Sequence, residues 1–174
     1  MIELYLVRHA VAENRSPARW PDDSERPLTP EGAARFRRAA HGLRRIVPSV
    51  ERLVSSPYAR AWQTAELLRD EAGWTEPEPS QLLTAIREPA ESLPLLHEIG
   101  RDATVALVGH EPHLSMLASL LVSGDQSAVH LDLKKGGVIA LEFESSAAPG
   151  AATLRWVVTP KILRRLASAR VDAR

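Results

Sequence analysis

The sequence predicts an α/β fold, a three-layer sandwich in which helices flank a mostly parallel central sheet. Short apolar runs alternate along the chain with longer segments that carry helix start and stop signals. Two of the apolar runs are almost continuously apolar, as expected of strands that helices cover on both faces. The length of 174 residues and the absence of a strong linker predict a single domain over residues 1–174.

Five apolar runs have the length of strands. They are Ile2–Val7, Val50–Val54, Thr104–Val108, Gly137–Phe143 and Ala152–Val158. The first and third are the almost continuous ones. A short loop with Gly and Pro joins the last two, which favours an antiparallel pair at a sheet edge. The most loop-like stretches are Asn14–Pro27, Gly73–Pro79 and Ser145–Gly150.

Helices are predicted between these strands from their end signals. Thr29-Pro30-Glu31 supplies an N-cap, a proline in the first turn and an acid near the positive end of the helix dipole, and this helix is expected to reach about Val47. A second helix starts after Ser56-Pro57 and ends near Gly73. The remaining helices are predicted over Pro89–Ile99, over Pro112–Ser123 and in a short segment after Pro160.

Composition excludes several classes of function. The 22 basic and 22 acidic residues give no net charge, which argues against a protein that coats nucleic acid or an acidic membrane. No apolar run approaches the roughly 18 residues of a membrane helix, and the N-terminus lacks the features of a signal peptide. The absence of cysteine excludes disulfides, thiolate zinc sites and a cysteine nucleophile. We therefore expect a cytoplasmic protein with no nucleic-acid or membrane partner.

Residues capable of chemistry follow three of the predicted strands. Arg8-His9 follows the first, Ser55-Ser56-Pro57 with Arg60 follows the second, and Gly109-His110 follows the third. Ligands of parallel α/β sheets bind beyond the carboxyl ends of the strands, where helix N-termini also point. Two arginines and two histidines in one such crevice predict a pocket for a doubly charged anion, and a phosphoryl group fits best.

Three segments also resemble the motifs of a known family. Leu6-Val7-Arg8-His9-Ala10 resembles the Arg-His-Gly motif of the histidine phosphatase (phosphoglycerate mutase-like) superfamily. Ser55 to Ala65 is similar to its Ser-Ser-Pro-x-x-Arg-x-x-Gln-Thr-Ala segment, and Val108 to Pro112 to its second-histidine motif. The short length and the Gly-His-Glu-Pro-His form resemble the SixA-type phosphohistidine phosphatases more than the mutases. The resemblance implies a phosphoglycerate mutase-like fold.

The resemblance also implies roles for four residues. His9 is expected to be the nucleophile that carries the phosphoryl group as phosphohistidine. Arg8, Arg60 and His110 are expected to bind the phosphoryl oxygens and to stabilise the transition state. These positive groups imply that no metal and no cofactor is required. The expected partner is a phosphorylated substrate, and a protein that bears phosphohistidine is the favoured one.

The sequence departs from the family pattern near the nucleophile and at the general acid. Ala10 replaces the usual Gly, and Ala12 and Arg15 stand where larger members often carry Thr and Asn. Glu88 follows Leu82-Leu83-Thr84, where the acid-bearing loop of the family should lie, and it is the candidate catalytic acid. Two further carboxylates, Glu13 and Glu111, are weaker candidates, and a solvated side chain is the more ordinary interpretation of all three.

Two other features have ordinary structural explanations. His113 is close to His110, but Pro112 between them is expected to start a helix, and a zinc site needs three or four ligands. One predicted helix is crowded with arginines, which are Arg35, Arg37, Arg38, Arg44 and Arg45. Such a run is usually a solvated helix face, although an anionic partner is able to dock there.

Three alternatives to a phosphohistidine phosphatase are open. A mutase needs a larger insertion to hold a second phosphate, for which 174 residues leave little room. A small-molecule phosphomonoesterase of the same superfamily would share the nucleophile and the anion-binding residues but would need an effective acid. A module that only binds phosphate or phosphopeptide would be expected to have lost the nucleophile, whereas His9 is intact.

Overall fold

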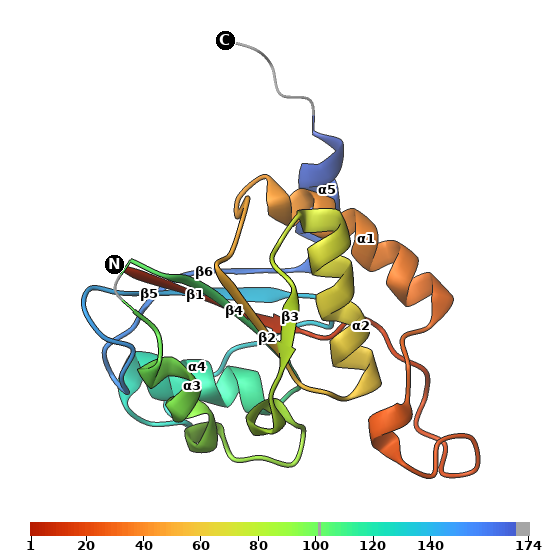
Figure 1. Ribbon diagram of the computed structural model, residues 1–174, viewed down its shortest axis with the longest axis horizontal. Coiled ribbons are helices and arrows are strands. Elements are labelled where there is room, and N and C mark those ends of the chain that lie inside the picture. Colours follow the sequence, from red (N-terminus) through yellow and green to blue (C-terminus); the bar gives the residue numbers. More distant parts are fainter. Residues whose placement is uncertain (101, 170–174) are drawn as a thin grey trace.

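A computed structural model describes residues 1–100 and 102–169 of the chain. Its centre is a six-stranded sheet with the strand order β3-β2-β4-β1-β5-β6 (Figure 1). The strands are β1 (Ile2–Arg8), β2 (Arg52–Ser55), β3 (Pro77–Pro79), β4 (Thr104–Gly109), β5 (Val138–Phe143) and β6 (Thr153–Val158). The α/β sandwich predicted from the sequence is confirmed.

The pairing of the strands determines where the chemistry can collect. β1 through β4 are parallel, β5 pairs antiparallel with β1, and β6 pairs antiparallel with β5. Arg8 lies opposite Gly109, and Ser55 lies opposite Val108, so β1, β2 and β4 end at the same edge. Because β5 runs the other way, its first residue, Val138, also lies at this edge, opposite Val7.

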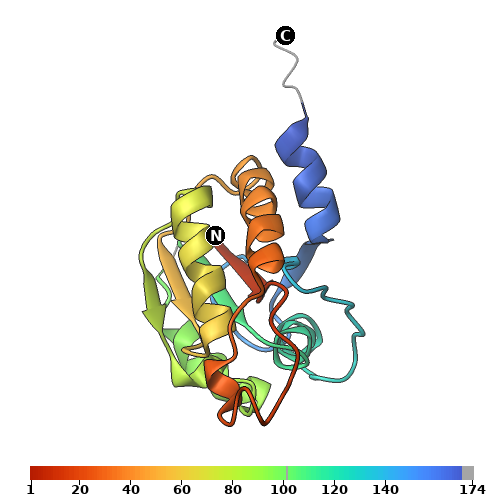
Figure 2. The ribbon, with the colours of Figure 1, turned by 90° about the vertical axis from the view of Figure 1, so that its right-hand side faces the viewer.

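Helices cover both faces of the sheet (Figures 1 and 2). They are α1 (Pro30–Arg44), α2 (Ala59–Leu67), α3 (Leu93–His97), α4 (His113–Ser123) and α5 (Pro160–Ser168). One face carries α1, α2 and α5, and the other carries α3 and α4. None of the helices in residues 1–100 and 102–169 is long and apolar enough to span a bilayer.

The apolar core is divided into two layers by the sheet. Alternate residues of a strand point to opposite faces. Accordingly, Tyr5 and Val7 of β1 pack with α1, α2 and α5, whereas Leu4 and Leu6 pack with α3 and α4. All four side chains are buried. Burial on both faces explains why β1 reads as a continuous apolar run, and it fixes the end of β1 within the fold.

The structure differs from the sequence-based expectations at three elements. Residues Pro77–Pro79, expected in a loop, form an edge strand parallel to β2, a position where proline is tolerated because one side of the strand needs no partner. The helix predicted to reach Val47 ends at Arg44. The helix predicted over Pro89–Ile99 is a 3₁₀ turn, Pro89–Ser92, followed by the short α3, which carries a second proline at Pro94.

Candidate active site

The four residues predicted to act together meet at one edge of the sheet. Arg8 ends β1 and His9 follows it, Arg60 lies in the first turn of α2, and His110 follows β4. All four line a cavity of about 260 Å³, which we call the phosphoryl cavity. The imidazole rings of His9 and His110 lie 5.3 Å apart between centroids. The parallel order of β2, β4 and β1 produces this meeting, as the sequence analysis expected.

The His9 imidazole is held with one ring nitrogen available. Its Nδ1 lies 2.7 Å from the carbonyl oxygen of Ala10, an acceptor, so Nδ1 carries the ring proton and donates it. Nε2 makes no hydrogen bond with the described residues and has a free lone pair. The backbone is fixed as well, since His9 N–H donates to Gly109 O at 3.0 Å and Ala10 N–H to Thr64 Oγ1 at 3.0 Å. The arrangement positions a neutral imidazole for nucleophilic attack.

His110 is oriented by the segment that follows β2. Its Nε2 lies 2.8 Å from Ser56 Oγ, and Ser56 N–H donates to Val108 O at 2.9 Å. A hydroxyl is able to donate its proton to Nε2, which leaves the ring proton of His110 on Nδ1. Nδ1 is buried and has no partner among the described residues. It is therefore free to donate to a ligand oxygen.

The two arginines are anchored by part of their guanidinium groups. Arg8 donates through Nη1 to Leu133 O at 2.8 Å. Arg60, only 2% exposed, donates through Nη1 to the carbonyl oxygen of Asp23 at 2.8 Å and through Nη2 to its carboxylate at 3.0 Å. The Nε–H groups of Arg8 and Arg60 are buried and have no partner among the described residues. Because buried N–H groups are nearly always satisfied in folded proteins, these two are available to an oxyanion.

Unpartnered buried polar atoms are concentrated in this cavity. Of the four such side-chain atoms in the described part of the chain, three belong to Arg8, Arg60 and His110, and the fourth is Trp20 Nε1. Cations also outnumber acids along the cavity wall. The cationic residues are Arg8, Arg15, Arg26, Arg60 and Lys135, and the acidic ones are Glu13 and Glu111. The excess of positive charge suits a doubly charged tetrahedral anion.

Burial keeps both histidines neutral. It lowers the pKa of His9 to about 3, and the positive charges of Arg60, Arg8 and Lys135 act in the same direction. It lowers the pKa of His110 to about 2, with further contributions from His9 and Arg60. At neutral pH the imidazole of His9 is therefore uncharged, which is the form in which Nε2 is able to attack phosphorus.

The structure does not bring Glu88 to the cavity. Glu88 is exposed and is the residue that precedes the 3₁₀ turn Pro89–Ser92, where its N–H donates to Glu91 at 2.8 Å. Of the two weaker candidates, Glu13 and Glu111 both line the cavity. Glu111 accepts a hydrogen bond from Ser115 N–H at 3.0 Å, and burial raises the pKa of its carboxyl. Which of the three carboxylates reaches the cavity therefore depends on the conformation of the loops that carry them.

His113 has a packing role. Its Nε2 lies 2.8 Å from Ser92 Oγ, and its Nδ1 lies 3.0 Å from Arg87 O, so it ties the 3₁₀ turn to α4. Across residues 1–100 and 102–169, no group of three or more His, Asp and Glu side chains has the arrangement of a metal site. The ordinary interpretation of His113 agrees with these contacts.

Sequence reasoning missed Asp23, which lies beside the cavity, and Arg26 and Lys135, which line it. Asp23 binds Arg60, and Arg26 lines the wall while its Nε donates to Asp23 at 2.8 Å. Both lie in Asn14–Pro27, a stretch without periodicity, so no sequence signal pointed to them. Lys135 had a signal, because it lies two residues before the predicted strand Gly137–Phe143, and an antiparallel strand beside β1 begins at the edge where β1 ends.

Three comparisons with known proteins agree with this geometry. The family model of the histidine phosphatase superfamily (branch 1) matches residues 4–90. An uncharacterized protein of Picosynechococcus sp. is 37% identical over 142 residues, which are 80% of this chain and 84% of that protein.

Solved structures extend the similarity to almost the whole chain. The chain resembles the protein histidine phosphatase SixA complexed with tungstate, with a TM-score of 0.80 and 24% identity over 92% of this chain and 99% of that one. It also resembles the putative phosphohistidine phosphatase SixA from Nakamurella multipartitia, with a TM-score of 0.74 and 28% identity over 91% and 95% of the two chains.

Proposed function

The chain belongs to the histidine phosphatase superfamily, branch 1, and is a phosphatase; from this premise we propose that it hydrolyses protein phosphohistidine through a phosphohistidine intermediate on His9. The observation that carries the proposal is the set of three unpartnered buried nitrogens, on Arg8, Arg60 and His110, around the available Nε2 of His9. Together they provide one nucleophile and three donors for phosphoryl oxygens.

The proposed reaction has two steps. The substrate phosphoimidazole is protonated on its other ring nitrogen before the first step. In that step the Nε2 lone pair of His9 attacks phosphorus, the P–N bond of the substrate breaks, and its electron pair leaves with the substrate ring as neutral imidazole. The hydrogen bond from Nδ1 to Ala10 O stabilises the positive charge that the His9 ring acquires. In the second, water attacks phospho-His9, inorganic phosphate leaves, and Nε2 regains its lone pair. Arg8, Arg60 and His110 neutralise the charge on the oxygens in both steps.

The leaving group determines why P–N bonds are favoured. An alkyl phosphate leaves as an alkoxide unless an acid protonates it, whereas protonated phosphoimidazole leaves as neutral imidazole. Glu88, the acid expected from the sequence, is exposed and outside the phosphoryl cavity. A site with a complete set of anion donors and no acid on the expected loop suits a leaving group that needs little help.

A second candidate function is the hydrolysis of small-molecule phosphate monoesters, and Glu111 is the observation that favours it. Its half-buried carboxyl lines the cavity, and burial raises its pKa, which favours the protonated form. A protonated carboxyl at this position would be a general acid for an alkoxide leaving group. The two functions therefore differ in their dependence on Glu111.

Side-by-side kinetics at one pH distinguish them. We expect kcat/KM for a phosphohistidine peptide to exceed that for an alkyl phosphate such as glycerol phosphate by at least about tenfold, or roughly 1.4 kcal/mol. We also expect Glu111→Gln to change the phosphohistidine rate little, and EDTA to leave it unchanged. A faster reaction with the alkyl phosphate that is lost in Glu111→Gln would establish the second function instead.

A further inference from the structure

A second hollow adjoins the phosphoryl cavity and is not used by the proposed chemistry. Its volume is about 340 Å³, and it lies between the first turns of α1 and α5 and the loop that precedes β5. Figure 2 shows α1 and α5 side by side on the same face of the sheet, and the two helices are packed against each other. Lys135 lines both hollows, and Ala10, which follows His9, is part of the wall of this one.

The rim of this hollow is basic. We call it the basic groove, after the five cationic residues that line it, which are Arg35, Lys134, Lys135, Lys161 and Arg164. None of the described residues that line it is acidic. The first turns of two helices, which carry partial positive charge, add to the potential of these side chains.

The floor of the groove is apolar. Phe36 is 3% exposed there, and Val11 and Pro160 lie beside it. Two glycines allow the backbone segments to approach closely. A Cβ on Gly32 would lie 2.2 Å from Val11 O, and a Cβ on Gly136, which has a φ of +75°, would lie 3.0 Å from the Phe36 ring. These close approaches of the backbone therefore determine the shape of the groove.

Three of the five cations have no acidic partner within the described residues. Lys134 pairs with Asp132 at 2.7 Å and Arg35 with Glu31 at 3.5 Å, but Lys135, Lys161 and Arg164 form no ion pair there. Burial and neighbouring cations lower the pKa of two of them, Arg8 and Arg26 acting on Lys135, and Arg35 and Arg38 acting on Arg164. An anion in the groove would relieve this repulsion.

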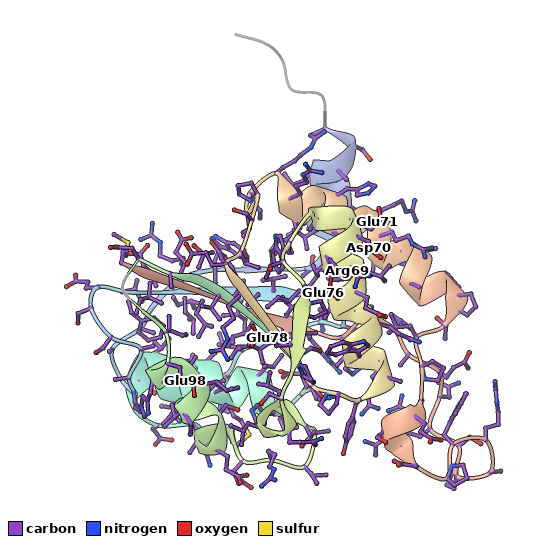
Figure 3. All side chains as sticks on the ribbon, in the orientation of Figure 1. Arg69, Asp70, Glu71, Glu76, Glu78 and Glu98 are labelled. Atoms are coloured by element: carbon purple, nitrogen blue, oxygen red, sulfur yellow. The ribbon has the colours of Figure 1, made fainter. Side chains whose placement is uncertain are left out.

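The opposite edge of the sheet shows how this chain treats cations elsewhere. Figure 3 labels Arg69 with Asp70, Glu71, Glu76 and Glu78 around β3 and the segment that follows α2, and Glu98 directly after α3. Arg69 pairs there with Asp70 at 2.7 Å and with Glu76 at 2.8 Å. Arg52 pairs with Glu78 at 3.2 Å and with Glu98 at 3.3 Å. Each of these two arginines has two acidic partners, whereas Lys135, Lys161 and Arg164 of the basic groove have none among the described residues.

We infer that the basic groove binds an acidic segment of the phosphoprotein substrate, with an apolar side chain on the Phe36 floor and carboxylates on the rim formed by Lys135, Lys161 and Arg164. The inference rests on the proposed function, because it places the groove beside the residue that receives the phosphoryl group. A phosphate polymer would use the cations alone, whereas a peptide with acidic and apolar residues uses both the rim and the floor. Of the arginines that the sequence left unexplained, Arg35 lines this groove.

Binding is tested first without any phosphoryl group. The probe is a fluorescein-labelled peptide of Asp, Glu, Leu and a central His, and its control replaces Asp and Glu by Asn and Gln. We expect the acidic peptide to bind the wild-type protein at least about tenfold more tightly at low ionic strength, and salt to weaken it. Lys161→Gln and Arg164→Gln should each lower the affinity several-fold. Arg165→Gln is the matched control, because Arg165 is exposed on the same helix but does not line the groove.

Turnover then separates this inference from the proposed function. With the same peptides phosphorylated on His, kcat/KM of the wild type should be higher for the acidic peptide. The double variant Lys161→Gln, Arg164→Gln should lose that preference. Its hydrolysis of phosphoramidate, which is too small to reach the groove, should be unchanged. Equal binding of the two peptides, or equal losses in Arg164→Gln and Arg165→Gln, would overturn the inference. So would equal binding of an oligonucleotide or of phosphatidylserine vesicles. Failure of the wild type to hydrolyse either phosphohistidine peptide would instead refute the proposed function.

Discussion

The ends of the central strands and the loop of residues 84–92 differ in whether their polar atoms have hydrogen-bond partners. At the strand ends, Arg8, Arg60 and His110 keep buried nitrogens unpaired. In the loop, polar groups bind one another, since the Glu91 carboxylate accepts a hydrogen bond from Glu88 N–H and forms an ion pair with Arg87. The difference teaches that the strand ends keep donors available for an anion, whereas the loop contributes no carboxylate to the phosphoryl cavity.

The largest effect should come from the nucleophile. His9→Ala is expected to lower kcat by about 10³ or more, because it removes the cavity's ring nitrogen that has a free lone pair, the Nε2 of His9. Steady-state kinetics measure this. A ³²P-labelled phosphoenzyme, trapped without acid, should appear in the wild type and not in the variant. Near-normal turnover by a folded His9→Ala protein would show that the strand ends only bind phosphate.

The second effect should come from Arg60. Arg60→Ala is expected to lower kcat/KM by about 10² and to weaken vanadate binding, because a guanidinium contributes to both ground and transition states. Arg52→Ala is the matched control, since it removes an arginine whose ion pairs lie at the β3 edge. Unchanged vanadate affinity in Arg60→Ala, measured by inhibition and by calorimetry, would contradict the role of the cavity in anion binding.

The third effect concerns stability and pH. The pKa of His9 is lowered to about 3 by burial, whereas an unfolded histidine titrates near 6.5, so the unfolded chain binds more protons between these values. The free energy of unfolding should therefore fall as the pH falls from 7 to 5, by about 2 kcal/mol for His9 alone. Urea denaturation at several pH values measures it. His9→Ala should remove this contribution to the pH dependence of the free energy of unfolding. His130→Ala, outside the cavity, is the control. If the free energy of unfolding of His9→Ala depends on pH as in the wild type, His9 titrates normally.

The smallest effect should come from the loop. Glu88→Gln is expected to change kcat/KM by less than about twofold for phosphohistidine and for aryl phosphates, because its exposed side chain lies outside the cavity. Steady-state kinetics with both substrates, beside Glu111→Gln, test this. A loss of tenfold or more in Glu88→Gln alone would show that the loop closes over the substrate and would reverse the comparison between the two regions.

Much of the fold and the main part of the site could be predicted from the sequence because their signals are local. β1 and β4 are almost continuous apolar runs, and helix starts such as Thr29-Pro30 are marked by a cap and a proline. Parallel strands then bring the residues that follow them to one edge, so Arg8, His9 and His110 could be placed together. The edge strand Pro77–Pro79 could not be predicted, because two prolines in three residues contradict strand propensity and only its place at the edge permits it.

The sequence by itself determined the architecture, the family and the residues at the strand ends, because periodicity, caps and motifs are written in neighbouring positions. The tertiary structure alone decided which side chains from irregular segments join them. In the folded chain Asp23 binds Arg60, and Glu88 lies outside the phosphoryl cavity. Lys161 and Arg164 line the basic groove together with Arg35. These meetings join residues far apart in the chain, and their geometry follows from the packing of loops and helices, which leaves no periodic signal in the sequence.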